Sequence, residues 1–199
     1  TPSEDVRDAE ELASGLGIKK YVIDISDAQN FISRLYVDDN KLSQLAYGNI
    51  APRLRMTLLY LYANSRGLLV VGTSNKSELL VGYFTKYGDG GADILPIGDL
   101  YKTHVRELAL WLGIPQRIID KKPSAGLWPG QTDEEELGIT YRELDLILYA
   151  LIDMRLSTEE ASAKTGIEID KVRRVHYMVE RSEHKRKPPS CPSIRHLLR

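Results

Sequence analysis

The stretch LLVVGTSNKSELLVGYFTKYGDGGAD, residues 68–93, joins an apolar run to a long polar segment that is rich in glycine. Four apolar residues followed by a glycine predict a short buried strand over Leu68–Gly72. In open α/β sheets, ligands bind outside the carboxyl ends of the strands. The polar side chains that come directly after this strand are therefore candidates for a binding site.

Thr73 and Glu78 are the first of these candidates. A hydroxyl at a strand end can bond a nucleotide base or ribose, and a carboxylate nearby can hold Mg²⁺ through oxygen ligands. The alternative is that Thr73 or Asn75 caps a short helix while Glu78 is a solvated surface acid. Spacing by itself favours this alternative.

Charges of both signs follow around the glycines, at Lys86, Asp89, Asp93 and Lys102. Glycine lets the backbone approach a ligand or adopt positive φ. Lysines could then bind phosphate while the carboxylates bind a ribose or an amide. A mobile loop whose charges only keep it soluble explains the same pattern, and physical reasoning leaves the two interpretations equally open.

The elements around this stretch predict an α/β fold, a three-layer arrangement of a parallel sheet with flanking helices. Helical patterns over residues 4–16, 26–35 and 42–64 alternate with apolar runs at Lys20–Ile25 and Leu68–Gly72. That order favours right-handed crossovers between parallel strands. Gly48 and Pro52 predict a break near the front of the third helix.

The second half of the chain is predicted to become helical. A helix is expected over residues 103–112, and a proline- and glycine-bearing loop over 121–138 that ends in the run DEEE. Thr140 and Ser157 each precede a glutamate by three residues, which is the capping-box pattern of a helix start. We expect one domain over 1–199, with a helical C-terminal portion at 140–185 and a basic, proline-interrupted tail at 186–199.

Composition excludes several classes of protein. The net charge is −1 over 199 residues, which argues against broad affinity for nucleic acid. No apolar run approaches the roughly 20 residues that span a bilayer, so we expect no membrane association. Cys191 is the single cysteine, which excludes a disulfide framework within one chain and favours a reducing, cytoplasmic setting.

Basic residues outside the central stretch have two interpretations each. Arg53 could clamp a phosphate or ring, although an exposed salt bridge is the more common role. The cluster His184-Lys185-Arg186-Lys187 could bind a phosphate-rich ligand, or it could be a solvated cap that complements a helix dipole. Residues 157–181 also approach helix-turn-helix spacing, but Ser162 and Thr165 stand where that motif needs small or apolar packing residues, which favours a plain helical bundle.

Taken together, the motifs resemble those of the ammonia-dependent NAD synthetases. The resemblance rests on GTSNKSELLVGYFTKYGDGGADILPIGDLYKTHVRELALWLGIP and on four flanking elements in matching order: GNIAPRLRM upstream, then KKPSAGLW, QTDEEELGITYRELD and SEHKRKPP downstream. It covers almost the whole chain. It implies a fold like the adenine nucleotide α-hydrolases, which is related to the Rossmann fold, and a homodimer with composite active sites.

The resemblance also implies a reaction and its residues. The substrates would be deamido-NAD, ATP and ammonia, and the products NAD, AMP and pyrophosphate, formed through an acyl-adenylate. Thr73 and Ser124 resemble ATP contacts, Glu78 resembles the carboxylate that holds Mg²⁺, and Lys102 resembles the lysine that neutralises the ATP phosphates. The residues that resemble contacts to deamido-NAD are Arg53, Lys86, Asp93, His184 and Lys185.

One departure from the family pattern stands out. The phosphate loop SGG-x-DS, expected between a first strand and a first helix, is absent from these 199 residues. The chain opens directly on Thr1-Pro2-Ser3-Glu4, which reads as a helix start with Thr1 as the N-cap. We therefore expect an N-terminally truncated synthetase that is inactive alone. A non-catalytic dinucleotide-binding or dimerisation remnant, or another ligase of the ATP-pyrophosphatase fold, remains as an alternative.

Overall fold

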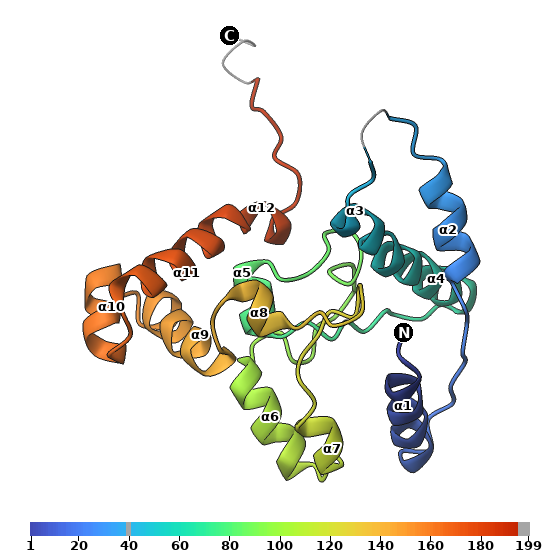
Figure 1. The fold of residues 1–199 in the computed structure, drawn as a ribbon, viewed down its shortest axis with the longest axis horizontal. Helices are drawn as coiled ribbons and strands as arrows, with labels where there is room; N and C mark the ends of the chain where they lie inside the picture. The colour runs from blue at the N-terminus through green and yellow to red at the C-terminus, as the bar shows by residue number, and fades with distance from the viewer. Residues whose placement is uncertain (39–40, 195–199) are drawn as a thin grey trace.

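The computed structural model describes residues 1–38 and 41–194. Its helices alternate with extended loops (Figure 1). In chain order, they are α1 Ser3–Gly15, α2 Ser26–Arg34, α3 Gln44–Gly48, α4 Ile50–Arg66, α5 Lys76–Val81, α6 Lys102–Trp111, α7 Gln116–Ile119, α8 Asp133–Leu137, α9 Tyr141–Leu148, the π-helical turn η1 Tyr149–Asp153, α10 Thr158–Thr165, α11 Ile169–Arg181 and α12 Glu183–Arg186. Helices α9 to α11 gather on one side and α2 to α4 on the other, with α5 and α8 between them.

The expected three-layer sheet is not found in the described residues. Lys20–Ile25 and Leu68–Gly72 run outside the helices, and the β pairing there is an isolated parallel bridge between Val71 and Ile94. An apolar run becomes a strand only when a neighbouring strand takes up its backbone hydrogen bonds, and these two runs do not pair with each other. Most of their side chains are correspondingly open to solvent, with Val22 70% exposed and Leu69 68% exposed, whereas Val70 is buried at 5%.

The N-terminal helices follow local sequence signals with one exception. Helix α3 ends at Gly48 and α4 begins at Ile50, so the predicted break falls there. Pro52 lies in the first turn of α4, where the missing N–H has no helical acceptor to lose. The expected cap at Thr1 was wrong, because α1 begins at Ser3 with Pro2 in the cap position and no side-chain capping bond.

The hydrophobic core lies in the C-terminal half. Leu144, Ile147, Val172 and Val175 are almost completely buried where α9 packs against α11, and Ala161 of α10 closes the same cluster. The helical bundle expected here is therefore confirmed. The predicted caps at Thr140 and Ser157 are also present, each accepting a hydrogen bond from the backbone N–H three residues on. Part of the predicted tail, residues 195–199, lies outside the described residues.

The loop expected over residues 121–138 contains a short helix. The acidic run forms α8, which ends at Gly138 with φ 64°. Four carboxylates in the first turn of α8 suit the positive end of its dipole, which explains why a run taken for loop becomes helical. Helix α9 contacts both α5 and α6, so the helix that follows Gly72 packs against the core. Within the described ranges, no helix is long and apolar enough to cross a membrane.

Candidate active site

Glu78 lies in a capping box at the start of α5. The Asn75 side chain accepts a hydrogen bond from the Glu78 N–H at 3.1 Å, and Glu78 Oε2 accepts one from the Asn75 N–H at 3.0 Å. The cap expected of Asn75 is therefore present. Glu78 is nevertheless not a solvated surface acid, because its side chain is only 16% exposed and its Oε1 lies 3.0 Å from Lys102 Nζ.

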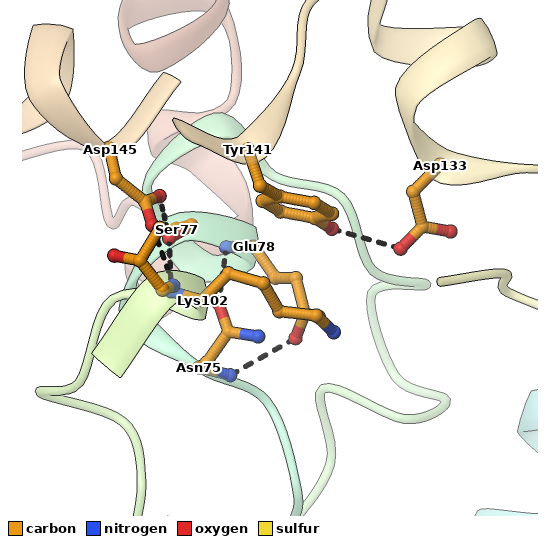
Figure 2. Close-up of polar contacts among 8 residues, drawn as sticks. Asn75, Ser77, Glu78, Lys102, Asp133, Tyr141 and Asp145 are labelled. Atoms are coloured by element: carbon orange, nitrogen blue, oxygen red, sulfur yellow. Dashed lines mark hydrogen bonds and ion pairs between the residues drawn. The ribbon is translucent and has the colours of Figure 1, made fainter. Parts of the chain in front are cut away.

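Lys102 is the first residue of α6, and that helix is capped from elsewhere in the chain. Its N-cap residue, Tyr101, makes no side-chain capping bond. Ser77 Oγ accepts the Lys102 N–H at 2.9 Å instead, and Asp145 Oδ2 accepts the Thr103 N–H at 2.8 Å (Figure 2). Ser77 also donates its hydroxyl to Asp145 Oδ1 at 2.5 Å. Lys102 is thus placed by contacts from α5 and α9.

A buried tyrosine lies close to the Lys102 ammonium and is hydrogen-bonded to a buried carboxylate. Lys102 Nζ is 5.2 Å from the centre of the Tyr141 ring, and the Tyr141 hydroxyl donates to Asp133 Oδ2 at 2.9 Å (Figure 2). Burial raises the pKa of Asp133 above its usual value. Within the described residues, Asp133 Oδ1 has no hydrogen-bond partner although it is buried. Asp133, Tyr141, Ser77 and Asp145 were not predicted as site residues.

The two predicted hydroxyl contacts are less closely tied to this ion pair. Thr73 and Ser124 are both exposed, and Ser124 Oγ accepts the N–H of Gly126 at 3.1 Å. Within the described residues, neither hydroxyl hydrogen-bonds to Glu78 or Lys102. Ser124 follows Pro123, whose carbonyl accepts the Asp133 N–H at 3.0 Å. That bond holds the loop containing Ser124 against α8.

The described residues offer no ready-made metal cage. They contain no group of three or more His, Cys, Asp or Glu side chains arranged to hold an ion. Mg²⁺ is commonly bound by one or two carboxylates together with substrate phosphates and waters. Glu78 fits that mode as a single carboxylate, since its two oxygens accept two hydrogen bonds and retain further lone pairs.

Four of the five residues that resemble dinucleotide contacts are brought together by the fold. Arg53 Nη2 donates to the Lys86 carbonyl at 3.4 Å, and Lys86 Nζ donates to the His184 carbonyl. Lys185 Nζ donates to the carbonyls of Gly82 and Phe84 at 2.6 and 2.8 Å. Burial lowers the pKa of Lys185. We call Arg53, Lys86, His184 and Lys185 the cationic group.

Asp93, the fifth of these residues, makes different contacts. Its Oδ2 accepts the Val70 N–H at 2.6 Å, and its Oδ1 accepts the Tyr60 hydroxyl at 3.1 Å. These bonds hold residue 93 beside the extended segment that ends at Gly72, next to the bridge between Val71 and Ile94. Asp93 therefore fixes the position of the backbone at Val70. Within the described residues, Asp93 makes no direct hydrogen bond to the cationic group.

Comparison with solved structures defines the class of protein. The fold aligns with the structure of NMN synthetase from Francisella tularensis over 97% of this chain and 74% of that one, with a TM-score of 0.80 and 40% identity. It also aligns with the NH3-dependent NAD synthetase from Campylobacter jejuni over the same shares, with a TM-score of 0.76 and 29% identity. The chain has the fold of this class of synthetase.

Sequence comparison gives the family. The family model described as NAD synthase matches residues 1–189. A relative from Hyperthermus butylicus, named NH(3)-dependent NAD(+) synthetase, is 55% identical over 96% of this chain and 69% of its own length. A relative of the same name from Archaeoglobus fulgidus is 53% identical over 100% of this chain and 75% of its own length. The chain belongs to the NAD synthase family.

Proposed function

We propose that this protein makes NAD by amidating deamido-NAD with ammonia in an ATP-dependent reaction. The observation that carries the proposal is the family match over residues 1–189, combined with the two groups of residues that the fold assembles. The first is the ion pair of Glu78 with Lys102, and the second is the cationic group. Family membership favours this reaction over that of another ligase with the same fold.

The chemistry requires an activated carboxylate. A carboxylate oxygen is a poor leaving group, so the nicotinate carboxylate of deamido-NAD attacks the α-phosphorus of ATP and pyrophosphate leaves. Ammonia then attacks the acyl carbon, AMP departs, and the amide remains. Charge develops on the phosphate oxygens in the first step, and a fixed cation stabilises it most when it needs no reorganisation. We assign that role to Lys102, which the bonds of Ser77 and Asp145 hold in place.

Mg²⁺ fits the acidic side of the same ion pair. Glu78 would hold the ion, and Mg²⁺ bound there would supply charge neutralisation at the ATP phosphates. Thr73 and Ser124 remain our candidates for contacts to ATP. Their exposure leaves both hydroxyls available to a ligand.

The cationic group has hydrogen-bond donors left for the dinucleotide. An ammonium carries three donors. Lys86 gives one of them to the His184 carbonyl, and Lys185 gives two to Gly82 and Phe84. The remaining donors, with the Arg53 guanidinium, suit the pyrophosphate and carboxylate of deamido-NAD. We retain Asp93 as a candidate contact to the same substrate.

We extend the proposal to the sheet, the oligomeric state and the cellular location of the protein. We propose that the extended segments form strands of a parallel sheet, which the bridge from Val71 to Ile94 supports. We propose a homodimer, supported by large apolar side chains left open on α2 and α4, with Phe31 63% and Leu59 52% exposed. Sedimentation velocity would test the dimer, because a monomer at every concentration rejects it. We also retain the cytoplasmic location that the single cysteine favours.

Ligand binding is the direct test of the proposed function. Isothermal titration calorimetry of the 199-residue chain should show binding of deamido-NAD and of ATP with Mg²⁺. Failure to bind either ligand would overturn the proposal. Formation of NAD from both substrates and ammonia tests separately the expectation that these residues are inactive alone. Binding without turnover, even in a longer form that restores upstream sequence, would favour the non-catalytic alternative.

The assignment of Glu78 has its own test. In a form with measurable turnover, Glu78→Gln should lower the Mg²⁺-dependent rate by a factor on the order of 10², because the neutral amide is a much weaker ligand. Glu107→Gln is the matched control, since Glu107 is exposed on α6. An unchanged rate across a Mg²⁺ titration of Glu78→Gln would show that Glu78 does not hold the metal.

One observation favours a second candidate for the acceptor, the substrate whose carboxylate is amidated. The solved structure from Francisella tularensis, 40% identical, is that of an NMN synthetase. The acceptor of this chain could accordingly be the nicotinate mononucleotide. Titrating deamido-NAD and the mononucleotide side by side distinguishes the two, and tighter binding of the mononucleotide would transfer the proposal to that acceptor.

A further inference from the structure

The turn Thr85–Gly88 holds a residue type that its backbone conformation disfavours. The Gly88 N–H donates to the Thr85 carbonyl at 2.9 Å, which closes a four-residue β-turn. Tyr87, in the third position, has φ 61°, while Lys86 in the second position is not in the positive-φ region. Positive φ at the third position alone is the type II pattern, which prefers glycine or asparagine there. A bulky side chain in this conformation is an outlier.

The surroundings of the turn impose this conformation. The Thr85 N–H donates to Asp89 Oδ1 at 2.9 Å, and Thr85 Oγ1 donates to Asn49 Oδ1 at 2.6 Å. Gly88 is buried, and a Cβ built there would lie 3.1 Å from the Cβ of Pro52. The backbone is thus fixed on both sides of Tyr87, which cannot relax to negative φ without breaking these contacts.

The tyrosine ring contributes little packing in return. Tyr87 is 58% exposed, and Lys86 Nζ lies over one face of its ring, 5.3 Å from the ring centre. Arg155 offers a useful contrast, since it is the other non-glycine residue with positive φ in the described residues. Arg155 follows η1, where the Leu156 N–H closes back onto the Ala150 carbonyl at 3.1 Å, so its conformation is that of an ordinary helix end.

We propose that Tyr87 is a stacking residue for an aromatic ring of the dinucleotide, an inference that rests on the proposed function. Strained residues that persist in a fixed backbone concentrate at ligand sites. Tyr87 adjoins the cationic group directly, through Lys86 and its bond to the His184 carbonyl. A ligand with phosphates and a heterocyclic ring would meet both features at once. Exposed aromatic side chains are the usual platforms on which nucleotide rings stack.

Two substitutions at position 87 separate the ring from the backbone. Tyr87→Asn suits the turn and removes the ring, while Tyr87→Phe restores the ring. Titration with deamido-NAD should show about a tenfold loss of affinity in Tyr87→Asn, which corresponds to about 1.4 kcal/mol, and its recovery in Tyr87→Phe. Tyr87→Asn should also raise the urea midpoint, because it relieves the disfavoured conformation.

Two controls make the readout specific. Arg155→Asn relieves the same backbone conformation away from the cationic group, so it should raise the midpoint and leave the affinity unchanged. Inorganic pyrophosphate carries charge without a ring, and it should bind Tyr87→Asn and the unchanged chain equally. A loss of pyrophosphate affinity equal to that for deamido-NAD would show general damage to the site and overturn the stacking role.

The outcomes also separate this inference from the proposed function. If the unchanged chain binds deamido-NAD and Tyr87→Asn binds it equally well, the stacking role is wrong and the proposed function stands. If Tyr87→Asn instead dissociates a dimer without weakening deamido-NAD, the ring serves a contact between copies, and the inference is also wrong. If the unchanged chain does not bind deamido-NAD, the inference is overturned together with the proposed function.

Discussion

The carboxylate of Asp145 joins three helices, and its removal should destabilise the protein strongly. Asp145 is 5% exposed on α9 and accepts hydrogen bonds from the Ser77 hydroxyl on α5 and the Thr103 N–H at the start of α6. Ser77 is fully buried and in turn accepts the Lys102 N–H. One side chain thus completes the capping of α6 and fixes the position of Lys102.

The magnitude follows from these bonds. Hydrogen bonds to a charged group contribute about 1.5–3 kcal/mol each, and Asp145→Ala removes two of them. Thr103 is only partly buried, so water can satisfy its N–H to some extent. We therefore expect a loss of about 3–4 kcal/mol in the free energy of unfolding, against the 5–15 kcal/mol (roughly) that is typical of native domains. Asp145→Asn keeps one acceptor oxygen and should lose about half as much.

Urea unfolding followed by far-ultraviolet circular dichroism measures this loss. Asp170→Ala is the matched control, because the Asp170 side chain is 91% exposed and lies 3.9 Å from Arg173. That control should stay within about 0.5 kcal/mol of the unchanged chain. A change within about 0.5 kcal/mol for Asp145→Ala as well would refute this role of Asp145, since the buried network would then contribute nothing measurable.

Three further predictions concern the C-terminal half. Arg186→Ala should destabilise the protein by about 2–4 kcal/mol, because the guanidinium donates to carbonyls at the ends of α5 and α11. Lys187→Ala is the control and should be nearly neutral. Equal effects of the two substitutions on stability would contradict this role of Arg186. Ser157→Ala should cost about 1 kcal/mol of stability in urea unfolding, and no loss would mean the cap is not formed. The hydrogen bond from Lys171 holds the pKa of Glu143 below its usual 4.5. The stability that this ion pair gives the folded protein is therefore present above pH 4.5, and it is lost as the pH falls through the pKa of Glu143 in the folded protein. Glu143→Gln should therefore destabilise at neutral pH and approach the unchanged chain below pH 4.5, while a constant difference would refute the linkage.

Local signals predicted most of the helices. Capping boxes act within four residues, so the sequence around Thr140 and Ser157 was sufficient to locate the starts of α9 and α10. Helix α8 was missed because its helical character depends on four acidic residues meeting the helix dipole, a pattern that also suits a solvated loop. The three-layer sheet stays a proposal, since a strand requires a partner that an apolar run does not specify.

Candidate site residues were predicted by motif, and what each contacts was decided by tertiary structure. Ser77 and Asp145 are 68 residues apart, so no local pattern could show that they cap α6 and place Lys102. Lys185 was expected to be either a ligand contact or a solvated cap. It is partly buried against the carbonyls of Gly82 and Phe84, about a hundred residues earlier, so it is not a solvated cap, and its contact to a ligand stays a proposal.

The sequence alone determined the family, the order of the longer helices and the two sets of charged residues that the proposed reaction requires. Those properties depend on residue identity and on spacing over a few turns. Only the tertiary structure decided that Glu78 pairs with Lys102, that Asp93 is bonded to Val70 and Tyr60, and that Tyr87 occupies a conformation suited to glycine. The physical reason is that hydrogen bonds, ion pairs and imposed dihedral angles depend on which distant segments the core brings within reach.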